Sequence, residues 1–198
     1  MSVQAAFNIA TFLPATLTAP ELTEAEFLAL CEQFPDSRLE YTCDGTLIIM
    51  PPTDPETGKQ TALLARRLGV WAEKHGLGSV VGPDAGFRFK DRSRRSPDAA
   101  WFNKERWQKA RASGQRYPVF APEFVIELRS PEDKIRLLQE KMEEYIDNGV
   151  QLAWLIDPSE RTVTIYRPGR EIEVLSNPAT VLGEGPVEGF VLDLNGIL

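Results

Sequence analysis

Cysteine and histidine are scarce in this sequence. Its 198 residues include two cysteines, Cys31 and Cys43, and one histidine, His75. Two irregularly placed cysteines exclude a disulfide framework and a zinc site built from thiolates. The one histidine ends a predicted helix, where we interpret it as a charge partner of the helix C-terminus, so a Ser-His-Asp triad and a histidine-rich zinc site both lack their parts. The low cysteine content favours a reducing compartment, and we expect a cytoplasmic protein.

Long apolar runs are also missing. No stretch approaches the roughly 18 consecutive apolar residues that a membrane span requires. Residues 1–20 contain no Lys or Arg that could begin a signal peptide, and Pro14 interrupts their apolar part. We therefore expect no membrane association, an extended N-terminal arm over residues 1–20, and a single domain over residues 21–198.

Positive charge is in deficit overall but is concentrated in one segment. The chain has 22 basic and 29 acidic residues, a net charge of -7. Residues 88–116 nevertheless carry ten Lys or Arg against three acids, which gives this segment a charge of +7. Such a segment predicts a basic surface for a phosphate-bearing substrate. A solvated loop followed by an exposed helix face is the alternative, and the sequence does not separate the two.

The first half of the chain predicts two helices and a hairpin. Thr23 and Glu26 form a capping-box pattern that opens a helix ending near Gln33. The dipeptide Asp44-Gly45 lies between two apolar runs and is typical of a β-hairpin turn. We interpret the Pro- and Gly-containing stretch 51–58 as a break before a second helix over about 59–75.

The second half predicts a central strand, a helix and further strands. In the run EFVIEL, residues 123–128, apolar side chains occupy both faces, as in a strand covered on both sides. Ser130-Pro131 resembles an N-cap and first-turn proline, so we expect a helix from there to Gly149. Strands follow over residues 151–176. Helices interleaved with strands indicate an α/β (α+β) fold with a mixed central sheet flanked by helices.

Three acids lie in apolar or aromatic surroundings: Glu40 in RLEYTC, Asp98 in SPDAAWF and Glu127 in PEFVIELRSP. A carboxylate is almost never buried without compensation. Three such acids meeting in a sheet would suit a divalent cation with oxygen ligands. Each also has a purely structural interpretation: Glu127 paired with a cation, Asp98 capping a turn, and Glu40 facing solvent.

These segments carry a family resemblance. SPDAAWF, PEFVIELRSPED and LLQEKMEEYIDNGVQLAWLIDP resemble the Uma-two family of restriction-endonuclease-like proteins, within the PD-(D/E)xK nuclease-like superfamily, over about residues 20–198. The resemblance implies a restriction-endonuclease-like core that binds Mg²⁺ or Mn²⁺. It identifies Asp98 and Glu127 as metal ligands and catalytic residues, and Glu40 as a third acid that completes the coordination or orients a metal-bound water.

The lysine of the superfamily motif is displaced in this chain, because Arg129 stands where the motif would have Lys. An arginine can hold a phosphate but does not readily lose a proton. The resemblance places the catalytic lysine on the following helix, at Lys141, although Lys134 has nearly the same angular position. We expect phosphate contacts from Arg129, and from Arg94 and Arg95 in the basic segment.

These observations predict a metal-dependent endonuclease that hydrolyses DNA phosphodiester bonds through Asp98, Glu127 and Lys141. The alternative is a nuclease-fold protein without turnover that binds nucleic acid or another partner, which the overall acidity and Arg129 favour. The choice between DNA and RNA stays open. We also expect a homodimer, because nucleases of this superfamily that cut both strands commonly pair.

Overall fold

The computed structural model describes residues 14–19 and 21–198 of the chain. Its main body is a six-stranded sheet in the order β11 (Glu173–Ser176), β10 (Thr162–Tyr166), β9 (Leu152–Asp157), β8 (Phe124–Leu128), β7 (Ala99–Asn103) and β4 (Gly78–Val81). Strands β8 and β9 are parallel and the other neighbours are antiparallel. The predicted mixed α/β fold is confirmed.

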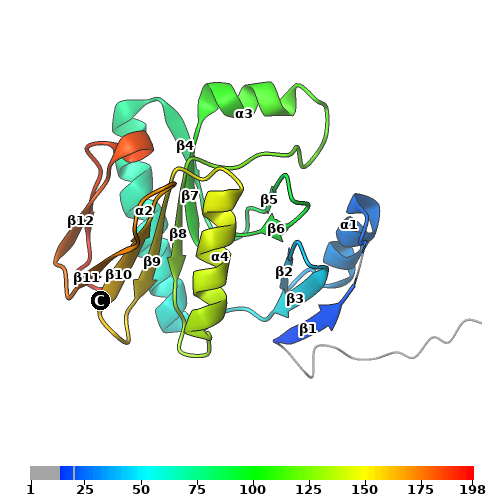
Figure 1. Ribbon diagram of the computed structural model, residues 1–198, viewed down its shortest axis with the longest axis horizontal. Coiled ribbons are helices and arrows are strands. Elements are labelled where there is room, and N and C mark those ends of the chain that lie inside the picture. Colours follow the sequence, from blue (N-terminus) through cyan, green and yellow to red (C-terminus); the bar gives the residue numbers. More distant parts are fainter. Residues whose placement is uncertain (1–13, 20) are drawn as a thin grey trace, which may run out of the picture.

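A second sheet lies beside the first and has the order β1 (Ala15–Thr18), β3 (Thr46–Met50), β2 (Arg38–Tyr41), β6 (Arg94–Arg95) and β5 (Phe87–Arg88). Helix α1 (Glu24–Gln33) packs on this sheet through Phe27. Figure 1 shows this sheet and α1 to the right of the six-stranded sheet. Two short strands, β12 (Thr180–Leu182) and β13 (Val191–Asp193), flank a 3₁₀ turn at Gly185–Val187 and pair with each other.

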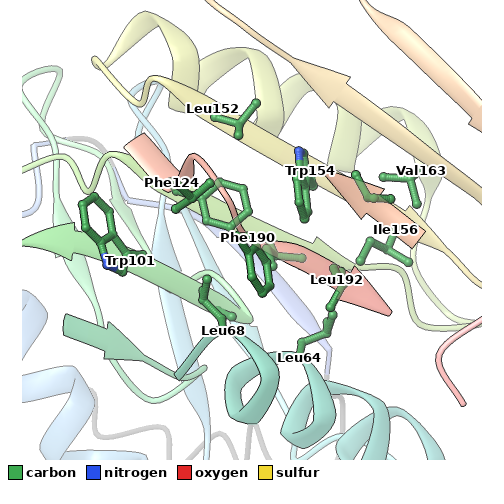
Figure 2. Close-up of a cluster of buried hydrophobic side chains, with 14 of the residues drawn as sticks. Leu64, Leu68, Trp101, Phe124, Leu152, Trp154, Ile156, Val163, Phe190 and Leu192 are labelled. Carbon is green, nitrogen blue, oxygen red and sulfur yellow. The ribbon is translucent and has the colours of Figure 1, made fainter. Parts of the chain in front are cut away.

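Helices α2 (Pro55–His75) and α4 (Ile135–Asp147) cover opposite faces of the six-stranded sheet (Figure 1). On the α2 face, Trp101, Phe124 and Trp154 from three strands meet Leu64 and Leu68 of the helix (Figure 2). On the α4 face, Leu138, Met142 and Tyr145 of the helix pack against strand residues that include Val125 and Leu155. Burial of apolar surface on both sides therefore fixes β8 at the centre of the domain, as its sequence predicted.

The hairpin and the capping box are both found where the sequence placed them. Strands β2 and β3 pair in antiparallel register, and Gly45 in the turn has φ 86°, in the left-handed region that glycine adopts without a Cβ penalty. Thr23 accepts a hydrogen bond from the backbone N–H of Glu26, whose side chain in turn accepts from the backbone N–H of Thr23.

Two helix starts differ from the prediction. Helix α2 begins at Pro55, and not near residue 59, because Asp54 accepts hydrogen bonds from two backbone N–H groups of the first turn. The proline that we interpreted as part of a break is therefore the first residue of the helix. Helix α4 begins at Ile135 because Ser130 donates both its N–H and its hydroxyl to the Asp133 carboxylate. That contact closes a turn ahead of the helix instead of capping it.

Strand β1 comes from the predicted N-terminal arm and pairs with β3, from Ala15 opposite Ile49 to Thr18 opposite Thr46. Residues 1–13 and 20 lie outside the described part, so the division into an arm and a single domain stays a prediction. None of the helices in residues 14–19 and 21–198 has the length and apolar composition of a membrane span. The remaining helix, α3 (Lys104–Arg111), follows β7 directly and exposes most of its cations.

Candidate acid and lysine site

The sheet register brings Asp98 and Glu127 together. Ala99 of β7 lies opposite Ile126 of β8 in an antiparallel pair, so one further step places Asp98 opposite Glu127. A hydrogen bond from the backbone N–H of Leu128 to Asp98 Oδ2, 2.8 Å long, holds the first carboxylate in place. Alternation along β8 turns Glu127 with Val125 toward α4. The two predicted metal ligands therefore share one end of the central sheet.

Glu40 reaches the same place from the second sheet. Tyr41 of β2 pairs with Arg94 of β6, and the chain continues from β6 through Ser96 to Asp98. Glu40 Oε1 accepts a hydrogen bond of 3.0 Å from the backbone N–H of Ser96. The three acids that the sequence indicated thus come from β2, from the start of β7, and from β8.

Helix α4 supplies the lysine that joins two of these acids. Lys141 Nζ lies 2.9 Å from Glu40 Oε1 and 2.8 Å from Glu127 Oε1, and its side chain is buried. One turn later, Tyr145 donates its hydroxyl to Glu127 Oε1 at 2.6 Å. Lys134 is an exposed residue at the N-cap of α4. The structure therefore brings Lys141, and not Lys134, to the acids.

Two arginines supply further positive charge to these acids. Arg95 Nη1 lies 3.2 Å from Glu40 Oε2, and Arg95 Nε donates to Glu144 of α4 at 2.8 Å. Arg38 Nη1 lies 3.1 Å from Asp98 Oδ1. The cluster, which we call the acid and lysine site, contains four acids and three cations: Glu40, Asp98, Glu127, Glu144, Arg38, Arg95 and Lys141.

The two fully buried glutamates have opposite pKa shifts. Burial by itself would raise the pKa of Glu40, but Lys141, Arg95 and Arg38 outweigh it and hold this pKa at about 2. Burial raises the pKa of Glu127 to about 7, and the nearby charges of Asp98 and Glu40 add to the rise while Lys141 opposes it. Glu40 is therefore a permanent anion near neutral pH, whereas Glu127 exchanges a proton there.

Lys141 and Tyr145 keep their protons. Burial would lower the pKa of Lys141, but Glu127 and Glu40 reverse the effect and raise it above the ordinary lysine value. Burial, followed by the charge of Glu127, raises the pKa of Tyr145. Lys141 is thus a fixed positive charge, and Tyr145 is a fixed hydrogen-bond donor to Glu127.

The donor set suits a divalent cation held by two carboxylates. No set of three or more His, Cys, Asp or Glu side chains within residues 14–19 and 21–198 is arranged to hold a metal ion. Both oxygens of Glu40 are bonded to protein donors. The bonds that Glu127 accepts both end on Oε1, which leaves Oε2 for another ligand. Mg²⁺ commonly binds one or two carboxylates and completes its shell with water and substrate phosphate.

Comparison with known proteins identifies the family. The family Uma2, described as "Putative restriction endonuclease", matches residues 24–195. The chain belongs to the Uma2 family. This confirms the resemblance that the sequence motifs indicated. No curated protein matches the chain.

A solved structure has the same fold. The crystal structure of "a putative nuclease belonging to DUF820" from Anabaena variabilis ATCC 29413 superimposes with a TM-score of 0.72. The two chains are 24% identical, and the match covers 87% of this chain and 94% of the other. At this identity the likeness concerns the fold alone.

The three predicted phosphate contacts lie in different surroundings. Arg95 belongs to the acid and lysine site through Glu40. Arg94 stacks over the Phe27 ring, 4.7 Å from its centroid, and is buried against α1. Arg129 pairs with Asp157 at 2.7 Å. Their role as phosphate contacts stays a prediction for this Uma2 family member.

Sequence reasoning missed Arg38, Tyr145 and Glu144 as members of the site. A signal existed for the first two: Arg38 lies two residues before Glu40 and so shares its face of the strand, and Tyr145 follows Lys141 by one helical turn. Glu144 had no such signal, because its partner Arg95 comes from a two-residue strand.

Lys141→Met should destabilise the protein strongly. The variant leaves Glu40 and Glu127 buried without their shared cation, so we expect the free energy of unfolding to fall by about 3–5 kcal/mol in urea denaturation. Lys134→Met, on the same helix but exposed, is the matched control and should change it by no more than about 0.5 kcal/mol. Equal effects of the two substitutions would show that Lys141 does not bridge the acids.

Glu127→Gln should remove a pH dependence of stability. Because the pKa of Glu127 is about 7 when folded and near 4.5 when unfolded, the folded state binds more protons between these values. The free energy of unfolding of the metal-free wild type should therefore fall from pH 5 to pH 8, by up to about 3 kcal/mol relative to the variant. Urea denaturation in EDTA measures this; parallel pH profiles would contradict the assignment.

Proposed function

We propose that this protein is a metal-dependent endonuclease that hydrolyses phosphodiester bonds of DNA. The observation that supports it most is the pair Asp98 and Glu127, held opposite each other beside Lys141 in a member of the Uma2 family. A buried carboxylate whose pKa rises to about 7 is costly to keep charged without a further cation, and such groups cluster at functional sites.

Asp98 and Glu127 would hold Mg²⁺ or Mn²⁺, with Glu40 as a predicted third acid. Such an ion, when bound, polarises a phosphoryl oxygen and lowers the pKa of a water molecule. Asp98 accepts the backbone N–H of Leu128, and Glu127 accepts Lys141 and Tyr145, so both carboxylates are positioned before any ligand arrives. Preorganisation of this kind avoids the cost of ordering the ligands during the reaction.

Lys141 is proposed to neutralise negative charge that develops on the phosphate in the transition state. Its raised pKa keeps it protonated at neutral pH, so electrostatic stabilisation suits it better than proton abstraction. Glu40 holds the ammonium group from one side and is itself held by Arg95 and by the N–H of Ser96. In this proposal Glu40 positions Lys141, which explains why an acid with both oxygens engaged lies in the site.

A binding protein without turnover is the second candidate. The observation that favours it is that Glu40, Asp98 and Glu127 each contact a protein cation while no ion is bound. The net charge of -7 favours a partner other than nucleic acid for such a protein, because an acidic protein gains less from non-specific contact with nucleic acid.

Plasmid nicking distinguishes these two candidates. We expect purified wild type to nick supercoiled DNA with Mg²⁺ or Mn²⁺ and to lose this activity in EDTA. Asp98→Ala and Glu127→Ala should lower the rate by at least about 100-fold, since each removes a metal ligand. Glu140→Ala, an exposed substitution on the same helix as Lys141, is the matched control for an unspecific effect of substitution and should be fully active.

Salt-dependent DNA binding by the wild type without any cleavage would instead establish the binding protein. Cleavage that survives in Asp98→Ala and Glu127→Ala would show that another site, or another protein in the preparation, carries the activity. The same assay on an RNA of matched sequence decides between DNA and RNA as the substrate.

We also propose that the protein works in the cytoplasm as a homodimer, which would supply two sites for the two strands of a duplex. Cys31 and Cys43 are both free thiols, in keeping with a reducing compartment. The edge strand β11 exposes Val174, next to the exposed Ile172, and an exposed edge of this kind readily pairs with a second chain.

Sedimentation at micromolar concentration should therefore give twice the chain mass of 22.2 kDa. Val174→Arg should shift the protein toward monomer, because it places a charge on the pairing edge. Val70→Arg, at an exposed apolar position on α2, is the matched control and should leave the dimer intact. A single species of 22.2 kDa for the wild type would contradict the dimer.

A further inference from the structure

Arg38 is the most exposed charged residue of the acid and lysine site. It is the first residue of β2, and its side chain is 31% exposed, whereas the side chains of Glu127 and Lys141 are 2% and 8% exposed. The side chain of its partner Asp98 is 11% exposed. Arg38 is therefore the charged group of this site that is most accessible from solvent.

Arg38 is also held less firmly than the other two cations. Arg95 contacts two carboxylates, on Glu40 and Glu144, through three nitrogen atoms. Lys141 contacts the carboxylates of Glu40 and Glu127. Among the described residues, Arg38 contacts one carboxylate, through Nη1, and its Nη2 reaches only the sulfur of Met50, at 3.5 Å. A thioether is a weak acceptor, so Arg38 loses little when this second contact breaks.

The contact of Arg38 occupies the oxygen of Asp98 that a ligand would reach. Oδ2 of Asp98 accepts the backbone N–H of Leu128, and Oδ1 accepts Arg38. A divalent cation bound to Asp98 would repel a guanidinium group at this distance, because like charges in a partly buried site interact strongly. Metal and Arg38 are therefore competitors for the same carboxylate.

A displaced Arg38 would remain beside the site, because its backbone is fixed in β2 between β3 and β6. The guanidinium group presents its N–H donors in a planar fork that matches two phosphate oxygens, and it stays charged at any working pH. A partly exposed arginine beside the acids of a site for phosphodiester hydrolysis is in position to meet the substrate backbone.

We propose that Arg38 is an exchangeable counter-ion of Asp98. It neutralises this carboxylate while the site is free of metal, and it binds a phosphate group of the nucleic acid once a divalent cation has taken its place. This proposal rests on the metal-dependent function proposed above. It assigns to Arg38 a direct contact with substrate that the family motif does not include.

Calorimetric titration with Mn²⁺ alone tests the first half of the proposal. Arg38→Gln removes the competing charge, so its Kd for Mn²⁺ should be roughly fivefold lower than that of the wild type, as expected for a partly exposed ion pair. Arg38→Lys keeps the charge and should bind Mn²⁺ like the wild type. Arg88→Gln breaks a pair of similar exposure, between Arg88 and Glu24, and is the matched control that should change nothing.

Binding of a short DNA duplex tests the second half, with Ca²⁺ in place of Mg²⁺ to limit cleavage. Arg38→Gln should weaken binding, and the slope of log K against log salt should fall by about one phosphate contact. Arg38→Lys should keep the salt slope but bind more weakly than the wild type, since an ammonium group lacks the planar fork. Arg88→Gln should bind like the wild type.

The outcomes separate this proposal from the proposed function. If the wild type binds Mn²⁺ and Arg38→Gln binds it with the same Kd and the same DNA salt slope, Arg38 has no exchange role, and the metal site stands without it. If the wild type binds no Mn²⁺, the metal-dependent function and the role of Arg38 are both overturned. Should Arg38→Gln not fold, Arg38→Lys still decides the phosphate contact through its DNA affinity.

Discussion

The double contact of Lys141 with Glu40 and Glu127 is the interaction on which the rest of the site depends. Glu40 belongs to the smaller sheet, Glu127 to the six-stranded sheet, and Lys141 to the helix that covers the latter. A single ammonium group thus joins three parts of the chain in a buried position. Because charges are costly to bury unless they are paired, this contact also fixes how the small sheet meets the large one. The apolar core and the sheet register determine where Asp98 and Glu127 lie, and the ion pairs determine where Glu40 lies relative to them.

The sequence indicated the burial of Glu40, Asp98 and Glu127 because burial and charge conflict in a way that is visible locally. Glu127 shares a face with Val125 and is flanked by Ile126 and Leu128 in a strand that is apolar on both faces, and such a position demands a partner somewhere in the fold. The central strand, the hairpin and the mixed sheet were predictable for the same reason, since alternation and turn residues are local signals. Which lysine meets the acid is not local. Lys134 and Lys141 have nearly the same angular position, but they differ by two turns, about 10 Å, along the helix axis. The turn at Asp133 also leaves Lys134 at the N-cap, outside the helix.

The sequence did not reveal that Arg95 pairs with Glu40 and Glu144, because these partners lie on distant segments. Arg95 is one of ten cations in a segment of net charge +7, and nothing in its neighbourhood distinguishes it from Arg94. In the structure, Arg95 is buried between Glu40 and Glu144, whereas Arg94 stacks on Phe27. The two-residue strand β6 explains the difference, because adjacent residues of a strand point to opposite faces. A charge run that suggested a continuous basic surface is therefore divided between a buried ion network, a packing contact and the exposed helix α3.

The opposite pKa shifts of Glu40 and Glu127 follow from how many cations each one meets. Glu40 contacts Lys141 and Arg95 and accepts the N–H of Ser96, so its negative charge is fully compensated. Glu127 shares Lys141 with Glu40 and lies near the charge of Asp98, so its own charge is compensated only in part. One additional positive charge beside Glu127 and Asp98 would make the ionised forms of all three acids favourable together. Lys141 thus completes the compensation of Glu40 but leaves Glu127 and Asp98 short of positive charge. This local deficit is the physical reason to expect a cation beside them.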